Sequence, residues 1–468
     1  MYNKKGGEKM IYQTSCKIIN KNSEPKLYNY CQNQCEGAKL LKNATIFRCR
    51  QLLFAHDKQY QDLLEHQIEV IKEFDDNTTD IYKKIGNDNY LPSANQFQKM
   101  YERTKNQDYY NPNLAAQTSI QIVRKTLNDF KSFFASSKDY SNDSTKYTGR
   151  PQLPKYIKTD ETTATFTNQD CVIYDINGKA YLKLPNMKED KSKKIRPNRR
   201  GYVKLGSLKI AKLMQVEIQP YYDTYKICMT YLKEEDSANL DENRILGIDT
   251  GVNNFLATSN NCGLFPFIID GREMKSYNRY YNKTLARLRS KLPKGQYTSE
   301  RIQQLSRKRD CYFQNLFHKM IAYIIDYCKT NYIGKIVFGH NKFQKQNYNK
   351  SAVQNQHFCF IPHAKFLNML KTQCAFVGIQ VIETEESYTS KASFLDMDDI
   401  PVYGNVTEEP TFSGKRKHRG LYVSKDGTLI NADVNGASNI IRKIFPNAFQ
   451  HIKDFTYLTK SVYKIKIK

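Results

Sequence analysis

The spacing of apolar residues changes twice along the chain, and this change constrains the fold more than any other feature of the sequence. Within residues 26–135 apolar side chains recur every three or four positions, which is the pattern of helices with one buried face. The clearest run is Ile120, Val123, Leu127, Phe130 and Phe134. After a joint at 135–155 that contains Gly and Pro, the period becomes two, and from residue 244 a strand region is followed by alternating helices and strands. The sequence therefore predicts a multidomain α+β protein that ends in a ribonuclease H-like α/β domain.

The region of period two contains a hairpin signal. Asn177-Gly178 stands between two short runs in which apolar and polar residues alternate. This dipeptide accepts the positive φ angles of a tight two-residue turn. The alternation continues over residues 216–231, so we expect a small antiparallel sheet or barrel here.

The net charge indicates the kind of partner. The 468 residues include 73 Lys and Arg but only 47 Asp and Glu, which gives a formal net charge of +26. Such an excess is more than solubility requires and favours nucleic acid as the partner. An anionic membrane surface is the alternative, but no basic amphipathic terminus is visible and no apolar run approaches the roughly 18 residues that span a bilayer. We expect no membrane association.

Cysteine usage indicates the compartment. The 11 cysteines are odd in number, irregularly spaced and without a Cys-x-x-Cys pair, and no apolar segment follows Met1. These features predict a reducing compartment rather than secretion: a cytoplasmic, nucleoid-associated protein, or a nuclear one in a eukaryote. Cys31 and Cys35 fall on one predicted helix, and we expect them to be buried as small apolar residues.

Two aspartates are candidates for metal-dependent catalysis. Asp249 ends an apolar strand between Gly247 and Gly251, which we interpret as room for a phosphate backbone. Asp433 precedes small residues that allow a helix to pack closely on a sheet. Cleavage of a phosphodiester with two cations about 4 Å apart requires several carboxylates on rigid elements, and Mg²⁺ prefers such ligands. The simpler alternatives are a turn residue at 249 and a helix N-cap at 433.

Taken together, the two stretches resemble a known family. Gly-Ile-Asp-Thr-Gly-Val-Asn-Asn at 247–254 and Asp-Val-Asn-Gly-Ala-Ser-Asn-Ile at 433–440 are similar to the first and third RuvC motifs of the TnpB family. These are RNA-guided nucleases encoded by insertion sequences and related to Fanzor proteins and compact type V CRISPR effectors. Tyr-Thr-Ser-Lys at 388–391 and Gly-Arg-Pro-Gln-Leu-Pro-Lys at 149–155 extend the resemblance. It covers most of the chain.

The resemblance also implies a division of the chain. Residues 1–25 would supply the first wedge strand or strands, 26–150 a helical recognition domain, 151–241 the wedge β-barrel, and 242–468 the RuvC nuclease domain. Within the RuvC domain, a basic helical insertion is expected at 272–331 and a degenerate zinc-ribbon loop at 387–431.

The third carboxylate departs from the family pattern. Most TnpB proteins carry a Glu at the end of the strand that corresponds to 335–339, where this chain has Gly339. We assign the role to Glu386, after the following strand, with Glu385 as the alternative acid. In the ribonuclease H topology, the strand that carries Asp249 should neighbour strand 335–339, with strand 379–384 beside that. Neighbouring strands are about 4.8 Å apart, and a glycine at 339 leaves room for the longer side chain to reach across. The opposite interpretation is that both glutamates form a solvated turn and that the nuclease is inactive.

The resemblance thus implies a catalytic and metal-binding set of Asp249, Glu386 and Asp433 with two Mg²⁺ ions. It does not extend to the family's zinc ribbon. The positions of the Cys pairs read Ser393-Phe-Leu-Asp396 and approximately Val423-Ser-Lys-Asp426, and one His cannot supply the four ligands of a structural zinc ion. We predict no structural zinc.

Basic residues interleaved with tyrosines are expected to contact nucleic acid. The stretch 273–331 has few acidic residues, and its cationic surface suits an RNA–DNA duplex, which proteins recognise by backbone shape. A second basic group lies near the Thr-Ser segment and in the run 414–419. The predicted contact residues are Arg279, Lys283, Arg287, Arg289, Arg307, Lys391, Arg416 and Arg419.

These observations predict an RNA-guided DNA endonuclease. Its expected partners are a guide RNA, a double-stranded DNA target and the displaced strand of that target. Two alternatives stay open: an RNA-guided DNA-binding repressor that has lost cleavage, and a guide-independent RuvC-like transposase or nuclease.

Overall fold

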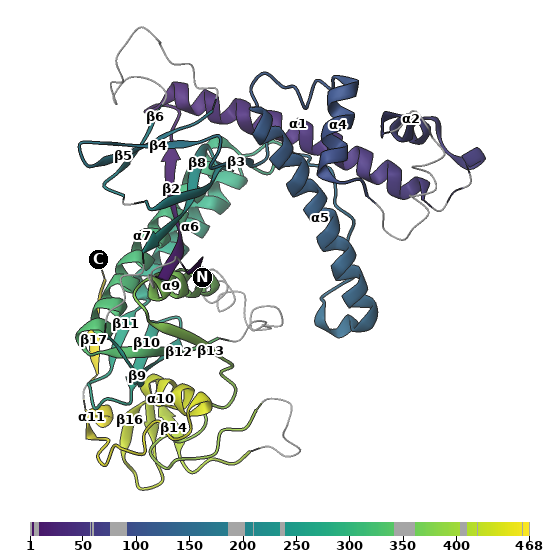
Figure 1. Cartoon of the computed structure of the whole chain (residues 1–468). Helices are drawn as coiled ribbons and strands as arrows, with labels where there is room; N and C mark the ends of the chain where they lie inside the picture. Colours follow the sequence, from purple (N-terminus) through teal and green to yellow (C-terminus); the bar gives the residue numbers. More distant parts are fainter. Residues whose placement is uncertain are drawn as a thin grey trace. The chain divides into compact units, whose positions relative to one another are not determined.

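Figure 1 presents the chain as a computed structural model. The structure describes residues 2–3, 9–56, 58, 60–74, 91–185, 202–208, 210–234, 239–340, 361–402, 410–418, 420–460 and 462–467. The chain forms two compact units. We call Tyr12–Lys233 the N-terminal unit, and Met1–Ile11 together with Glu234–Lys468 the C-terminal unit.

Helices form the first part of the N-terminal unit. They are α1 (Pro25–Ala55), α2 (Glu65–Phe74), α4 (Ala94–Thr104) and α5 (Ala116–Asn142). The helical face predicted from apolar spacing is confirmed, because Ile120, Val123 and Leu127 of α5 are buried. Helix α4 begins with a capping box, in which the side chains of Ser93 and Gln96 each accept a backbone N–H of the other residue.

Antiparallel strands form two sheets among the described residues, with the orders β1-β2-β8-β7-β3 and β4-β5-β6. The strands are β1 (Tyr2–Asn3), β2 (Lys9–Ile19), β3 (Ala164–Thr167), β4 (Val172–Ile176), β5 (Lys179–Lys183), β6 (Tyr202–Gly206), β7 (Lys212–Tyr221) and β8 (Thr224–Glu234). The predicted hairpin is confirmed: β4 and β5 pair across Asn177 and Gly178, whose φ angles are 53° and 72°.

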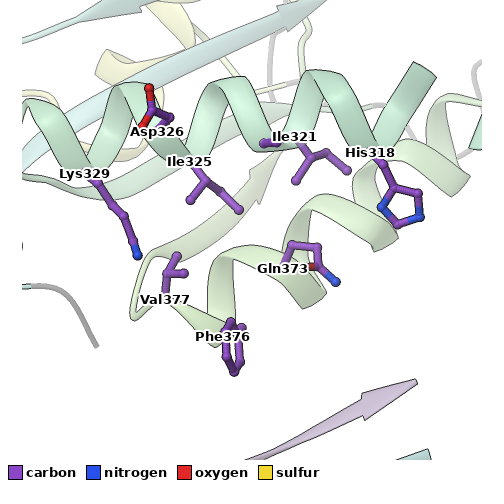
Figure 2. A pocket seen from close by; sticks show the side chains of 9 residues that line it. His318, Ile321, Ile325, Asp326, Lys329, Gln373, Phe376 and Val377 are labelled. Carbon is purple, nitrogen blue, oxygen red and sulfur yellow. The ribbon is translucent and has the colours of Figure 1, made fainter. Parts of the chain in front are cut away.

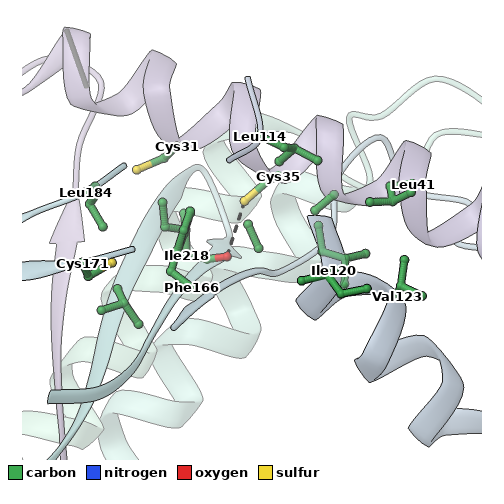
Figure 3. Close-up of a cluster of buried hydrophobic side chains, with 14 of the residues drawn as sticks. Cys31, Cys35, Leu41, Leu114, Ile120, Val123, Phe166, Cys171, Leu184 and Ile218 are labelled. Atoms are coloured by element: carbon green, nitrogen blue, oxygen red, sulfur yellow. Dashed lines mark hydrogen bonds between the residues drawn. The ribbon is translucent and has the colours of Figure 1, made fainter. Parts of the chain in front are cut away.

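One apolar core joins α1 and α5 to the larger sheet. Figure 3 shows Cys31 and Cys35 of α1 in this core, where the Cys35 thiol donates a hydrogen bond to the carbonyl oxygen of Ile218 at 3.5 Å. The prediction that both cysteines are buried is confirmed, and burial raises the pKa of Cys31 to about 12, so that the thiol stays protonated. Cys16 of β2 and Cys228 of β8 form a disulfide, which the sequence analysis did not predict.

A mixed sheet organises the C-terminal unit. Its strand order among the described residues is β13-β12-β9-β10-β11-β17. The strands are β9 (Asp241–Thr250), β10 (Asn254–Asn260), β11 (Phe267–Asp270), β12 (Ile333–Gly339), β13 (Gln380–Thr384) and β17 (Tyr463–Ile465). Strands β9, β12 and β13 run parallel, whereas β9, β10 and β11 form an antiparallel meander. The expected order, in which the strand of Asp249 neighbours 335–339 and then 379–384, is confirmed.

Helices cover both faces of this sheet. They are α6 (Arg272–Arg289), α7 (Glu300–Thr330), α9 (His363–Phe376), α10 (Ala432–Ile444) and α11 (Thr456–Thr459). Apolar residues of α7 and α9 pack on Leu246 and Ile248, while α10 packs on Ile245 and Val337 of the other face. A small sheet of β14 (Lys415–His418), β15 (Leu421–Val423) and β16 (Leu429–Asn431) precedes α10. The predicted multidomain α+β class with a ribonuclease H-like domain is confirmed.

None of the helices in the described ranges combines the length and the apolar composition that a membrane-spanning segment needs.

Candidate active site

The side-chain alternation of β9 determines which residues face α10. Ile248 points into the core beneath α7 and α9, so Gly247 and Asp249 point to the opposite face. A Cβ atom on Gly247 would lie 2.4 Å from a backbone carbonyl oxygen of α10, and one on Gly251 would lie 2.5 Å from the carbonyl oxygen of Asn254. These glycines therefore admit a helix and a tight turn. The interpretation that they make room for a phosphate backbone is wrong.

Asp249 lies at the carboxyl end of β9. Burial raises the pKa of its carboxyl group well above the ordinary value, and the carboxyl groups of Glu386 and Asp433 raise this pKa further. A backbone hydrogen bond at Thr250 and the positive charge of Arg416 act in the opposite direction. The carboxyl groups of Glu386 and Asp433 therefore both lie close enough to Asp249 to repel its charge.

Glu386 extends toward Asp249 through the space above Gly339. It follows the end of β13, which is separated from β9 by β12. A Cβ atom on Gly339 would lie 2.9 Å from Cγ and 3.0 Å from Oε1 of Glu386, so any other residue at 339 would compete with this side chain for space. The hydroxyl of Thr250 donates a hydrogen bond to Oε1 at 3.5 Å. Burial raises the pKa of Glu386 to about 7, although the Thr250 hydrogen bond opposes this shift.

Glu385 points to a different partner. Its carboxylate forms an ion pair with Lys443, whose side chain is only 6% exposed, and accepts a hydrogen bond from the backbone N–H of Ser387 at 2.9 Å. Burial opposes ionisation, but the hydrogen bonds from Lys443 and Ser387 lower the pKa of Glu385. Lys443 lies ten residues after Asp433 on α10, which is about 15 Å along the helix. Glu385 therefore anchors this end of α10 through Lys443, and its charge also raises the pKa of Glu386.

Asp433 does not cap α10. The N-cap is Asn431, whose side chain accepts hydrogen bonds from the backbone N–H groups of Asp433 and Val434. The Asp433 carboxylate instead accepts a hydrogen bond from Nδ2 of Asn254 at 2.6 Å on Oδ2, and one from Nη2 of Arg416 at 3.4 Å on Oδ1. The alternative that Asp433 serves as a helix N-cap is therefore wrong.

Two fully buried asparagines of α10 hold the segment that follows Glu386. Nδ2 of Asn439 donates hydrogen bonds to the carbonyl oxygens of Thr389 at 3.0 Å and Ala392 at 2.8 Å. Nδ2 of Asn435 donates to the same oxygen of Ala392 at 2.8 Å. Helix α10 thus carries one carboxylate and fixes the loop that presents another. Both asparagines belong to the motif at 433–440, but the sequence did not indicate what they bind.

The sequence analysis also missed Thr250 and Lys443. The position of Thr250 directly after Asp249 was a usable signal, because a strand-end hydroxyl can reach the same site. Lys443 is 58 residues away from Glu385, and no local pattern connects them.

Carboxylate hydrogen bonds connect the segments at the zinc-ribbon positions. Oγ of Ser393 donates to Oδ2 of Asp396 at 2.6 Å, and the backbone N–H of Lys425 donates to the same oxygen at 2.8 Å. Asp398 accepts two hydrogen bonds from Ser413, at 2.6 and 3.0 Å. These connections use neither Cys nor His.

The predicted nucleic-acid contacts on α6 share one face. Arg279, Lys283 and Arg287 are exposed and follow one another at intervals of four residues. Arg289, near the end of the helix, is also exposed, and Arg307 on α7 is partly buried.

The other predicted contacts lie nearer the acids. Lys391 is exposed in the Thr-Ser segment, and Arg416 on β14 contacts Asp433. Arg419 lies outside the described residues.

A surface pocket between α7 and α9 lies on the sheet face opposite α10 and has no part in the acidic cluster (Figure 2). The pocket is lined by His318, Ile321, Ala322, Ile325, Asp326, Lys329, Gln373, Phe376 and Val377.

The donor chemistry of the acidic cluster fits Mg²⁺. Within the described ranges, no group of three or more His, Cys, Asp or Glu side chains is already arranged around a metal position. The cluster nevertheless offers hard oxygen ligands on a strand end, a loop and a helix start. A Cβ atom on Gly436 would lie 2.7 Å from Oδ2 of Asp249, so the glycine in α10 lets the helix pack close to this carboxylate without a clash. A cation would relieve the repulsion that raises the pKa of Asp249.

Comparisons with known proteins agree with this fold. Residues 227–344 match the family model OrfB_IS605, described as a probable transposase, and residues 363–440 match the Cas12f1-like TNB domain. The cryo-EM structure of a Cas12f1–sgRNA–target DNA complex is similar with a TM-score of 0.52 and 14% identity, over 89% of this chain and 82% of that one. A CRISPR-Cas12f ternary complex, at 14% identity over 90% of this chain and 83% of that one, is less similar in structure, with a TM-score of 0.32. No curated protein matches in sequence.

The fold and the site define a ribonuclease H-like domain with a carboxylate cluster at the carboxyl ends of its parallel strands. The two family matches include Asp249 in the first segment, and Glu386 and Asp433 in the second. They confirm the resemblance to TnpB proteins and to compact type V effectors.

Proposed function

We propose that this chain is an RNA-guided DNA endonuclease in which Asp249, Glu386 and Asp433 hold two Mg²⁺ ions. The observation that carries the proposal is the convergence of these carboxyl groups on one face of the sheet, where burial and mutual repulsion raise the pKa of Asp249. Carboxylates confined in this way are stable in their charged form when cations neutralise them.

Bound Mg²⁺ would activate a water molecule and stabilise the charge that develops on the scissile phosphate. The chain's own residues prepare the ligands. Thr250 holds Glu386, Asn254 holds Asp433, and the bare backbone of Gly339 keeps the path of Glu386 open. Arg416 contacts Asp433 from the small sheet, and its half-exposed guanidinium group would bind a phosphate that enters the site.

The proposed partners are a guide RNA and a DNA target. The structurally similar Cas12f1 was solved with an sgRNA and target DNA. The net charge of +26 and the exposed basic face of α6 support the same partners for this chain. An A-form heteroduplex would be bound through its backbone.

Cleavage by the purified full chain tests the proposal. RNA that co-purifies with the chain would be sequenced, and DNA complementary to its guide segment would be added with Mg²⁺. We expect cleavage by the wild type and at least about a 100-fold lower rate for Asp249→Ala, Glu386→Gln and Asp433→Asn, with DNA binding retained. Glu385→Gln is the matched control, because Glu385 pairs with Lys443, and its rate should stay within about threefold of the wild type.

The alternatives give different outcomes. RNA-dependent binding of intact DNA by the wild type would identify a repressor. Cleavage that needs no RNA would identify a guide-independent nuclease. Either outcome overturns the proposal. Equal activity of Glu386→Gln and the wild type would overturn the assignment of the third acid.

A further inference from the structure

A lysine of β17 reaches the acidic cluster through one intermediate side chain. Strand β17 pairs in parallel with β11, and Lys464 lies opposite Ile268 in this register. Nζ of Lys464 donates a hydrogen bond to Oδ1 of Asn254 at 3.1 Å. Nδ2 of the same amide donates to Oδ2 of Asp433 at 2.6 Å. The three residues form a continuous hydrogen-bonded chain that ends on a proposed metal ligand.

The chemistry of the partners fixes the orientation of the amide. A lysine ammonium group can only donate hydrogen bonds, so the oxygen of Asn254 must face Lys464. The amide NH₂ group must then face Asp433. The flipped amide would place its NH₂ group against an ammonium group and its oxygen against a carboxylate, and both contacts would be unfavourable.

A second carboxylate holds the lysine in place. Nζ of Lys464 lies 4.0 Å from Oδ1 of Asp270, whose side chain is only 7% exposed. Arg272 forms an ion pair with the same carboxylate at 2.6 Å. Asp270 lies opposite Asn254 in the β10–β11 pairing, so the sheet register brings lysine, amide and carboxylate together.

We propose that Lys464 is a positioning residue: it orients the Asn254 amide, and the amide holds the Asp433 carboxylate ready for its cation. This inference rests on the proposed function. Partners that orient metal ligands typically change metal affinity or activity by 10- to 100-fold when they are replaced.

Lys464→Met tests the inference, because it removes the ammonium group and keeps most of the apolar stem. We expect the Mg²⁺ concentration for half-maximal cleavage by the guide-loaded, DNA-bound complex to rise about 10-fold. Lys464→Arg can still donate to the amide and should stay within about threefold of the wild type. Lys466→Met is the matched control, since Lys466 is exposed, neighbours the same strand and carries the same charge.

A double-variant cycle separates positioning from other roles. If Lys464 acts through the amide, then Lys464→Met should have no further effect in an Asn254→Ala background. Additive effects of the two substitutions would overturn the inference. A weaker affinity for DNA with an unchanged Mg²⁺ requirement would also overturn it, because Lys464 would then be a phosphate contact.

A readout without cleavage keeps this inference separate from the proposed function. The rise in melting temperature that Mg²⁺ alone produces in the full chain reports cation binding. This rise should be smaller for Lys464→Met than for Lys466→Met at the same Mg²⁺ concentration. If the wild type fails to cleave, the proposed function fails, and the melting experiment still decides the role of Lys464. If the wild type cleaves and both lysine variants respond to Mg²⁺ alike, only this inference fails.

Discussion

At the scale of single residues, Gly339 decides whether Glu386 can enter the site. A Cβ atom at 339 would lie 2.5 Å from Cδ1 of Ile440, 2.9 Å from Cγ of Glu386 and 3.0 Å from its Oε1. We therefore expect Gly339→Ala to displace Glu386 and to lower the cleavage rate at least about 10-fold. Because the added methyl group overpacks the core, the free energy of unfolding should fall by about 1–3 kcal/mol. Single-turnover cleavage and urea denaturation would measure the two effects.

Gly149→Ala is the control for this prediction, because a Cβ atom there meets nothing within 4 Å. It should leave both the rate and the stability unchanged. A fully active Gly339→Ala variant would mean that Glu386 does not need the path across β12.

The raised pKa of Glu386 predicts a pH-dependent stability of the metal-free chain. The folded-state pKa is about 7, against an ordinary value of 4.5, so the folded state favours the protonated acid. Stability from this group is therefore complete below pH 4.5 and is lost as the pH rises through about 7. In EDTA, Glu386→Gln should become more stable than the wild type above this window, by on the order of 3 kcal/mol.

Denaturation at a series of pH values would check this prediction. Glu385→Gln should behave in the opposite way, because the Lys443 pair lowers the pKa of Glu385 and stabilises its charged form at neutral pH. Parallel pH profiles for the wild type and Glu386→Gln would show that Glu386 is not buried beside the other acids.

At the scale of secondary-structure elements, α10 couples two parts of the site. Asn439 is fully buried and donates both of its described amide hydrogen bonds to the segment after Glu386. We expect Asn439→Ala to leave the carbonyl oxygens of Thr389 and Ala392 without these donors, at a cost of about 1–3 kcal/mol in the free energy of unfolding. Because the loop then loosens, cleavage should fall at least about 10-fold, while guide RNA binding is retained.

Asn447→Ala, at an exposed position soon after α10, should change neither stability nor cleavage. If Asn439→Ala cleaves at the wild-type rate, other contacts suffice to hold the loop. Melting temperature and single-turnover rates measured on both variants would decide this.

Local patterns explain which elements could be predicted from the sequence. The strand order β13-β12-β9 followed from the ribonuclease H topology that the succession of strands and helices indicates, and the glycine at 339 suggested the space that Glu386 now occupies. Long-range polar pairs leave no such pattern. Lys464 and Asn254 are 210 residues apart, and although Asn254 ends the motif at 247–254, no local pattern connects it to Lys464. The glycines beside Asp249 were misread because only the folded structure reveals what lies against them, which is helix α10 at Gly247 and the backbone of a turn at Gly251.

At the scale of the whole molecule, the excess of 26 positive charges should appear as a strong salt dependence of nucleic-acid binding. Arg279, Lys283 and Arg287 share the exposed face of α6. If each contacts a phosphate, the triple replacement by Gln should reduce the slope of log K against log salt concentration by about two to three. The cleavage rate at saturating DNA should not change, because these residues lie outside the acidic cluster.

The triple variant Lys425→Gln, Lys453→Gln and Lys460→Gln removes the same charge from other exposed positions of the C-terminal unit. Its slope should change by less than about one, since counterion release depends on charges that contact phosphates. Equal slope changes for both triple variants would mean that net charge, and not the face of α6, attracts the nucleic acid. A much larger change for the α6 variant would locate the duplex on that helix, because only charges that touch the backbone release its counterions.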